Sequence, residues 1–159
     1  MKQAHCFQRR CSMGGVIIKR ASIGDVWPLA EMDKICFSQP WSEQSFYEEI
    51  VCNKLARYLI AEIGGVMAGY AGIWVVLDEG HITNVAVHPD FRRKGIAKAL
   101  ISSLIESSAA EGVTMFTLEV RASNNDAISL YKRLGFTVHG SRKAYYDDND
   151  EDAMIMWKK

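Results

Sequence analysis

The sequence predicts a single layered α/β domain with four helices and a mixed, mostly antiparallel sheet of seven strands. Three observations lead to this prediction. Runs rich in β-formers alternate with segments of helical periodicity. Three of the predicted strands follow one another through short turns, as in an antiparallel meander. A helical segment then joins the third of them to another strand, and a crossover of that kind makes those two strands parallel.

The chain begins its regular structure with a strand and two helices. Residues 16–18 are apolar and β-branched, which favours a strand. Residues 24–37 carry apolar side chains at helical spacing. Ser42 is a typical N-cap for a second helix that extends to about Asn53, and Pro40-Trp41 separates the two helices.

The meander occupies the middle of the chain. Residues 57–63 and 66–77 are β-rich and flank Gly64-Gly65, a typical two-residue hairpin turn. Residues 78–80 form a second predicted turn, which leads to a strand at residues 81–88. Together these segments indicate three neighbouring antiparallel strands.

The second half of the sequence predicts the crossover helix, one further helix and the remaining strands. A helix runs from about residue 94 to 111, with Gly112 placed to end it, and a strand follows at residues 114–121. Asn124 or Asn125 caps the next helix, which Gly135 ends. Two final strands span residues 136–146 and 153–158, and an acidic loop at residues 147–152 joins them.

Length, charge and composition exclude several classes of protein. We expect a flexible N-terminal extension at residues 1–14 and one domain at residues 15–159. The formal net charge of zero argues against a nucleic-acid or membrane-surface binder, and no apolar run approaches the roughly 20 residues of a membrane span. We therefore expect a cytoplasmic protein with reduced cysteines. His5, Cys6 and Cys11 could contribute metal ligands, but a closed site usually needs four, so we expect no metal.

The segment from Asn84 to Ala97 is the most informative stretch of the chain. It predicts a strand that ends at a proline and a basic turn, after which Gly95 opens a helix. Free backbone N–H groups converge at such a helix N-terminus, and the helix dipole favours an anion there. Cations are unfavourable at that end unless an anion is bound, so the basic residues 92–98 indicate a phosphate-bearing cofactor.

This segment carries a resemblance to a known family. Arg92-Arg93-Lys94-Gly95-Ile96-Ala97 matches the acetyl-CoA motif Arg/Gln-x-x-Gly-x-Gly/Ala of the GCN5-related N-acetyltransferase (GNAT) superfamily. The order of predicted elements fits the same fold. Within that superfamily the chain resembles the bacterial ribosomal-protein-alanine N-acetyltransferase (RimI-type) branch. The segments that match this branch are residues 40–42, 81–87, 117–124, 142–146 and 151–157.

The resemblance implies a set of cofactor-binding residues and a detail of the fold. In the family the two central parallel strands splay apart, and the exposed edge of one pairs with the pantetheine of acetyl-CoA. The residues to which this role transfers are Val85, Ala86 and Val87 on the strand, Arg92, Arg93, Lys94, Gly95, Ile96, Ala97 and Lys98 at the turn, and Asn124. Asn124 is equally well explained as a simple N-cap, and the three strand residues as core.

The resemblance also implies a catalytic pair and a substrate groove. Glu119 would be the general base that accepts a proton from the attacking amine, and Tyr131 the general acid that protonates the departing thiolate. Alternation places Glu119 on the less apolar strand face with Thr117 and Arg121. Glu119 could instead be a solvated carboxylate or pair with Arg121, and Tyr131 could be a core aromatic. Trp41, Asn84, Tyr145 and Tyr146 would line the substrate groove, or pack as partly buried side chains.

The resemblance therefore implies an acetyl-CoA-dependent enzyme that transfers acetyl to the N-terminal amine of a protein by direct attack in a ternary complex. By resemblance, the target is the N-terminal alanine of a small-subunit ribosomal protein, whose basic N-terminal segment the acidic loop could attract. One alternative is acetylation of a small-molecule amine or a protein lysine. Another is a binding module of the same fold that senses acyl-CoA or docks on a partner.

Overall fold

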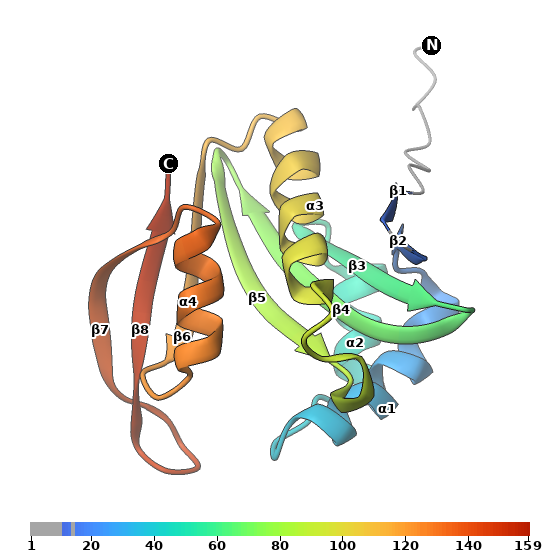
Figure 1. Ribbon diagram of the computed structural model, residues 1–159, viewed down its shortest axis with the longest axis horizontal. Helices are drawn as coiled ribbons and strands as arrows, with labels where there is room; N and C mark the ends of the chain where they lie inside the picture. The colour runs from blue at the N-terminus through green and yellow to red at the C-terminus, as the bar shows by residue number, and fades with distance from the viewer. Residues whose placement is uncertain (1–10, 14) are drawn as a thin grey trace.

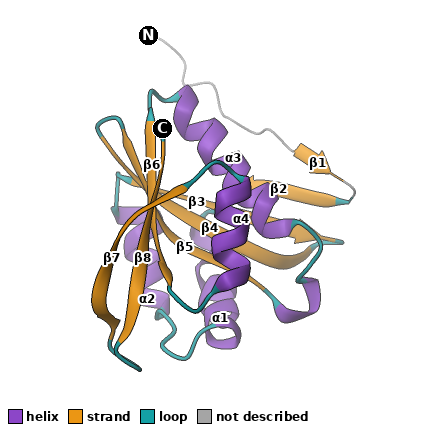
Figure 2. Cartoon of the chain, turned by 60° about the vertical axis from the view of Figure 1, so that its left-hand side comes forward, coloured by secondary structure: helices purple, strands orange, loops and turns teal. Residues whose placement is uncertain are grey.

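The computed structural model describes residues 11–13 and 15–159, which form one mixed sheet with helices on both faces (Figures 1 and 2). The strands of this part lie in the order β1-β2-β3-β4-β5-β6-β8-β7. They are β1 (Cys11–Met13), β2 (Val16–Arg20), β3 (Ala56–Ile63), β4 (Val66–Val76), β5 (Glu79–Val87), β6 (Met115–Arg121), β7 (Thr137–Tyr146) and β8 (Glu151–Lys158). The α-helices are α1 (Val26–Cys36), α2 (Glu43–Tyr47), α3 (Ile96–Ala110) and α4 (Asn125–Arg133).

Three short helical segments complete the fold. Single 3-10 turns precede α1 (η1, Ile23–Asp25) and follow β5 (η3, Pro89–Phe91). A π-helical segment, η2 (Glu48–Cys52), extends α2. The predicted extent of the second helix is therefore confirmed, but its hydrogen bonding changes from the α-helical to the π-helical pattern at Glu48.

The seven predicted strands correspond to β2 through β8. The additional strand β1 lies in the segment that we expected to be a flexible extension, where Cys11–Met13 pairs antiparallel with β2. The rest of that predicted extension, residues 1–10 and 14, lies outside the described residues.

Local sequence explains where the helices begin and end. The Ser42 hydroxyl accepts a hydrogen bond from Ser45 N at 3.1 Å, as expected of an N-cap of α2. Gly135 adopts φ of 93° directly after the last turn of α4, and Phe136 N donates to Tyr131 O at 3.0 Å. This is the glycine-dependent helix end that the sequence predicts.

The second turn of the meander differs from the expectation. It consists of Leu77 and Asp78, since β5 already begins at Glu79. Gly80 is therefore a strand residue, and the reason for a glycine there is space. A Cβ at this position would lie 2.8 Å from Ile73 Cδ1 and 2.9 Å from Phe116 Cδ1. The acidic loop is likewise shorter than expected, because β8 begins at Glu151.

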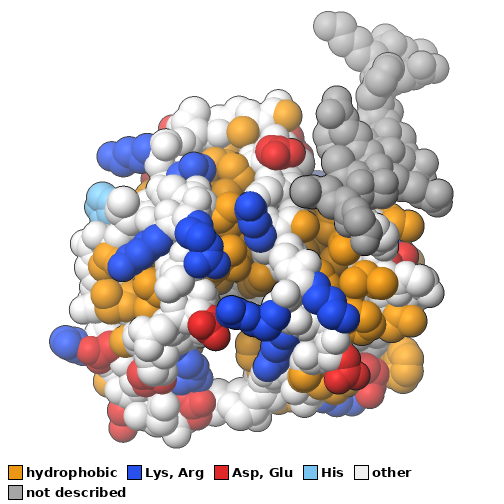
Figure 3. Space-filling model, in the orientation of Figure 1, with side chains coloured by type: hydrophobic (Ala, Val, Ile, Leu, Met, Phe, Trp, Pro, Cys, Tyr) orange, Lys and Arg blue, Asp and Glu red, His pale blue; other side chains and the backbone are white. Residues whose placement is uncertain are grey.

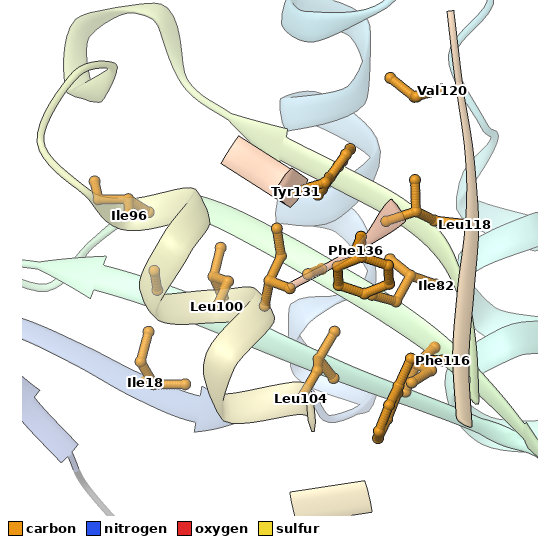
Figure 4. Close-up of a cluster of buried hydrophobic side chains, with 14 of the residues drawn as sticks. Ile18, Ile82, Ile96, Leu100, Leu104, Phe116, Leu118, Val120, Tyr131 and Phe136 are labelled. Atoms are coloured by element: carbon orange, nitrogen blue, oxygen red, sulfur yellow. The ribbon is translucent and has the colours of Figure 1, made fainter. Parts of the chain in front are cut away.

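The helices divide the core into two layers. α3 and α4 cover one face of the sheet over a cluster that includes Leu100, Leu104, Phe116 and Phe136 (Figure 4). α1 and α2 cover the other face over a second cluster, which includes Leu29, Phe46, Tyr58 and Tyr70. The sheet is thus buried on both sides along β3, β4 and β5.

The parallel pair at the centre of the sheet is splayed, as the resemblance implied. β5 and β6 pair from Glu79↔Met115 to Ile82↔Leu118 and no further along their described length. Beyond that point β5 remains paired only with β4, and Glu119 to Arg121 of β6 remain paired with β8. The facing edges of the two strands therefore carry free backbone groups.

Candidate active site

A cleft of about 320 Å³ opens where β5 and β6 part. Its walls come from the α1–α2 connection, the ends of both strands, the start of α4 and the end of β7. Seven of the residues expected at the site line it, namely Trp41, Asn84, Val85, Glu119, Asn124, Tyr131 and Tyr146. The fold thus brings together residues that lie up to 105 positions apart in the sequence.

Glu119 lies on the cleft wall and is paired with a cation. Its carboxylate Oε1 is 2.8 Å from Nε of Arg142 on β7, and the Glu119 side chain is 25% exposed. Arg121, the partner that the sequence suggested, is engaged elsewhere. Tyr145 does not line the cleft, but it lies against Glu119, since a hydrogen bond to the Glu119 carboxylate raises the pKa of Tyr145.

Arg121 instead binds the acidic loop. Its guanidinium contacts Asp148 Oδ2 at 2.8 Å and Glu151 Oε2 at 3.3 Å, and lies 3.9 Å from the centroid of the Tyr146 ring. Hydrogen bonds from Ser123 hold the pKa of Glu151 at about 2. Two carboxylates of the loop, Asp148 and Glu151, thus hold Arg121 against Tyr146 at the cleft, which weakens the expectation that the loop attracts a basic substrate.

Tyr131 is both a core residue and a cleft residue. It lies in the buried cluster beside Leu118, with its ring centroid 6.0 Å from that of Phe136 (Figure 4). The side chain also lines the cleft. Burial raises the pKa of Tyr131 to about 12, so its hydroxyl stays protonated at neutral pH, as that of an ordinary tyrosine does.

The turn between β5 and α3 presents free backbone donors. Arg93 and Gly95 adopt φ of 62° and 76°, and the helical hydrogen-bond series of α3 begins with Ala99 N donating to Gly95 O at 3.0 Å. The N–H groups of residues 95–98 therefore precede that series, as at any helix start. Where residues of right-handed and left-handed backbone conformation alternate, successive N–H groups converge on one point and form a concave anion-binding site.

The basic side chains of the turn surround these donors. Figure 3 shows Lys and Arg side chains gathered on the face that carries the start of α3. Arg92 Nε donates to Val87 O at 3.1 Å, which ties the turn to the end of β5. Arg93 and Lys94 are exposed, with Arg93 Nη1 3.8 Å from Asp126 and Lys94 Nζ 5.3 Å from the Phe91 ring centroid. Lys98 is exposed, while Ile96 is buried and Ala97 is half-buried.

The remaining predicted cofactor residues fall on both sides of this turn. Asn124 caps α4, since its Oδ1 accepts a hydrogen bond from Ala127 N at 3.2 Å, and the same side chain lines the cleft. Ala86 is buried in the core beneath α1 and α2, so only its backbone is available to a ligand. The Val87 carbonyl is engaged by Arg92 and by the Cys36 thiol, 3.6 Å away.

Sequence reasoning missed a buried acid in the cleft wall. Asp33 of α1 is 2% exposed, and it accepts hydrogen bonds from the Tyr70 hydroxyl and from Trp41 N, the latter at 2.8 Å. Burial raises the pKa of Asp33. Its burial could have been predicted from its position, because Asp33 falls four residues after Leu29 on the apolar face of the predicted helix.

A second polar network supports Asn84. The Tyr58 hydroxyl lies 3.2 Å from both Asn84 Oδ1 and Glu49 Oε2, and Trp74 Nε1 donates to Glu49 Oε2 at 2.6 Å. Glu49 belongs to the π-helical segment, which no sequence pattern indicated. This network fixes one wall of the cleft from beneath.

The described residues hold neither a cluster of metal ligands nor a membrane-spanning helix. Within this part of the chain, no three or more His, Cys, Asp or Glu side chains cluster as metal ligands. No helix there has the length and apolar character to cross a bilayer. His5 and Cys6 lie outside the described residues.

The chain is similar to known acetyltransferases. Residues 26–136 match the model of the acetyltransferase (GNAT) family. A Bacillus subtilis (strain 168) protein, provisionally named a ribosomal protein bS18-alanine N-acetyltransferase, is 40% identical over 140 residues, which cover 88% of this chain and 93% of that protein. The Escherichia coli (strain K12) protein of that name is 45% identical over 121 residues, covering 74% of this chain and 79% of its own.

Solved structures agree with these matches. The crystal structure of the Escherichia coli ribosomal-protein-S18-alanine N-acetyltransferase superposes with a TM-score of 0.83 at 36% identity, covering 90% of this chain and 92% of that one. Arabidopsis thaliana NAA60 in complex with acetyl-CoA gives a TM-score of 0.80 at 21% identity, covering 89% and 97% of the two chains, and shares the fold.

Proposed function

The chain belongs to the acetyltransferase (GNAT) family and uses acetyl-CoA as acetyl donor; on that premise we propose that it acetylates the N-terminal amine of a protein. The proposed acceptor is the N-terminal alanine of a small-subunit ribosomal protein. The names of relatives at 40% and 45% identity support this choice. A ribosomal acceptor would place the reaction in the cytoplasm.

One observation supports the chemistry above all: Glu119 and Tyr131 line a single cleft at the point where the parallel strands part. In the proposed reaction the amine nitrogen attacks the thioester carbonyl carbon, and the carbon–sulfur bond breaks. Glu119 accepts the proton that the amine loses, directly or through a water. Tyr131, which is protonated at neutral pH, gives its proton to the departing thiolate.

The residues present fit acetyl-CoA. The free N–H groups at the start of α3 would hold the pyrophosphate, with Gly95 keeping the turn in its left-handed conformation. The unpaired edge of β5 beyond Ile82 would hold the pantetheine amides. The thioester would then lie between Glu119 and Tyr131.

Acid–base chemistry favours an α-amine over a lysine as acceptor. An α-amino group has a pKa of about 7.7–8.0, whereas that of lysine is about 10.4. Roughly a tenth of the α-amine is therefore neutral near pH 7, against well under a thousandth of the lysine. A single carboxylate that is half-buried and paired with Arg142 is a modest base, which suits the α-amine better than the lysine.

The deciding experiment compares three acceptors with the full chain. These are a peptide that starts with alanine and contains an internal lysine, the same peptide with its N-terminus blocked, and a polyamine. We expect acetylation of the first alone, with the added acetyl placed on the α-amine by fragmentation mass spectrometry. Acetyl on the lysine, or faster turnover of the polyamine, would overturn the proposed acceptor. Failure to release CoA with any of them would favour a binding module.

A further inference from the structure

The β7–β8 pair contains a bulge beside the candidate active site. Arg142 pairs with Ala153, and the next pair along the two strands is Tyr146 with Glu151. Three residues of β7, 143–145, therefore oppose the single residue Asp152 of β8. Bulges bend the strand and re-aim side chains, and they are frequent next to active sites.

The bulge contains a strained residue that one carboxylate holds in place. Ala144 adopts φ of 48°, in the left-handed region that a residue with a Cβ avoids. Asp152 Oδ1 accepts a hydrogen bond from Ala144 N at 3.0 Å, and Asp152 Oδ2 lies 2.7 Å from Lys143 Nζ. Both oxygens of Asp152 are thus bound to the bulge.

The bulge determines which side chains reach the cleft. In a regular strand, neighbouring side chains point to opposite faces. Here Arg142 and Tyr145 both contact Glu119, while Tyr146 lines the cleft and contacts Arg121. The rings of Tyr145 and Tyr146 meet edge to face, with centroids 5.1 Å apart. A regular β7 could not present this set to one site.

We propose that Asp152 is a positioning residue for the acceptor substrate: it holds the bulge of β7 in the form that places Arg142 and Tyr145 against Glu119. Asp152 itself does not line the cleft and acts through residues 143–145. The inference rests on the proposed function, since it takes the β7 side of the cleft as the acceptor side. Acetyl-CoA would lie against β5 and α3, which Asp152 does not touch.

The test is a set of steady-state measurements with the alanine-starting peptide. In Asp152→Ala we expect the KM for peptide to rise about tenfold, because the strained turn loses its two ties. The KM for acetyl-CoA should stay within about twofold of wild type, because the variant leaves α3 and β5 unchanged. Adding Ala144→Gly should restore the peptide KM, since glycine adopts positive φ without strain. Asp150→Asn is the matched control, because it removes the same charge two residues away.

A second variant covers the case in which Asp152→Ala does not fold. Ala144→Val destabilises the bulge from the β7 side, because a β-branched residue adopts the φ of 48° even less readily than alanine, while Asp152 on β8 is unchanged. This variant should raise the KM for peptide and leave the KM for acetyl-CoA unchanged. An unchanged peptide KM in these variants, a parallel rise in both KM values, or no rescue by glycine would overturn the inference.

One readout does not depend on activity. The ionisation of Tyr145, obtained as the absorbance difference at alkaline pH between each protein and its Tyr145→Phe form, should shift to lower pH in Asp152→Ala. The hydrogen bond to Glu119 that raises the pKa of Tyr145 would then be lost. An unshifted Tyr145 titration in Asp152→Ala would contradict the role of Asp152, whatever the activity of the wild-type protein. If the wild-type protein transferred no acetyl to the peptide, that result would contradict the proposed function and leave the role of Asp152 to the titration.

Discussion

Glu119 and Tyr131 reach one cleft from opposite faces of β6. Leu118 and Val120, the neighbours of Glu119, pack with Tyr131 in the core beneath α4. Glu119 therefore points to the other face, where Arg142 contacts it. The arrangement separates the proposed base from the proposed acid by the thickness of the strand, so that each can serve a different side of the reacting thioester.

Replacing Glu119 tests the base. In Glu119→Gln we expect kcat to fall about a hundredfold at pH 7, because the amine must lose its proton unaided. The deficit should shrink to less than about tenfold at pH 9, where an α-amine of pKa about 8 is already neutral. The measurement is a pH–rate profile, with the exposed Glu106→Gln as control. A deficit that stays constant across this range would contradict the assignment.

Replacing Tyr131 tests the acid. Tyr131→Phe keeps the packed ring and removes only the hydroxyl. We expect kcat to fall about 10- to 100-fold while the KM values for peptide and acetyl-CoA stay near wild type, because the hydroxyl would act on the leaving thiolate alone. Steady-state kinetics with Tyr47→Phe, a change at an exposed tyrosine of α2, provide the comparison. A rise in KM with unchanged kcat would assign Tyr131 to binding instead.

The sequence predicted the helices, strands and helix caps better than the residues of unusual backbone conformation or unexpected burial. Helix caps such as Ser42 and Asn124 follow local rules, and both are confirmed. The left-handed residues Arg93 and Ala144 carry no local signal, because tertiary contacts impose their conformation. Asp33 escaped notice for a similar reason, since its partners Tyr70 and Trp41 come from other elements.

The splay of β5 and β6 shows the same limit. From pattern alone, residues 81–88 and 114–121 predict an ordinary parallel ladder. Only the family resemblance indicated that pairing would stop, as it does after Ile82↔Leu118. The feature arises from the packing of whole elements, so no short segment encodes it.

Gly95 tests the proposed pyrophosphate site. Its φ of 76° makes any side chain unfavourable, and a carboxylate there would also repel phosphate. We expect Gly95→Ala to weaken acetyl-CoA binding moderately and Gly95→Glu to weaken it at least about a hundredfold in titration calorimetry. Gly112→Ala is the matched control, because Gly112 flanks the other end of α3 with φ of 100°. Equal affinities for the Ala and Glu variants would argue against phosphate at this turn.

The buried Asp33 makes a prediction about stability. Tyr70→Phe removes one of its two donors and should destabilise the fold by about 1–3 kcal/mol, the cost of a poorly satisfied buried polar group. Adding Asp33→Asn should recover part of this loss, since a neutral amide is easier to bury than a carboxylate. Urea unfolding at pH 7 measures both variants. Additive losses in the double variant would show that the two side chains act independently.

Tyr131 should also make stability depend on alkaline pH. Burial raises its pKa from 10 in the unfolded chain to about 12 in the folded protein, so the native state holds the proton more tightly. The stabilisation is complete below about pH 10 and is lost as pH rises towards 12, at about 1.4 kcal/mol per pH unit. Between those limits wild type should lose about 2–3 kcal/mol more than Tyr131→Phe. Tyr58 and Tyr70, whose pKa values burial also raises, contribute equally to both proteins and cancel. Parallel stability curves from urea unfolding at pH 9, 10, 11 and 12 would mean that the Tyr131 hydroxyl is hydrated in the folded protein.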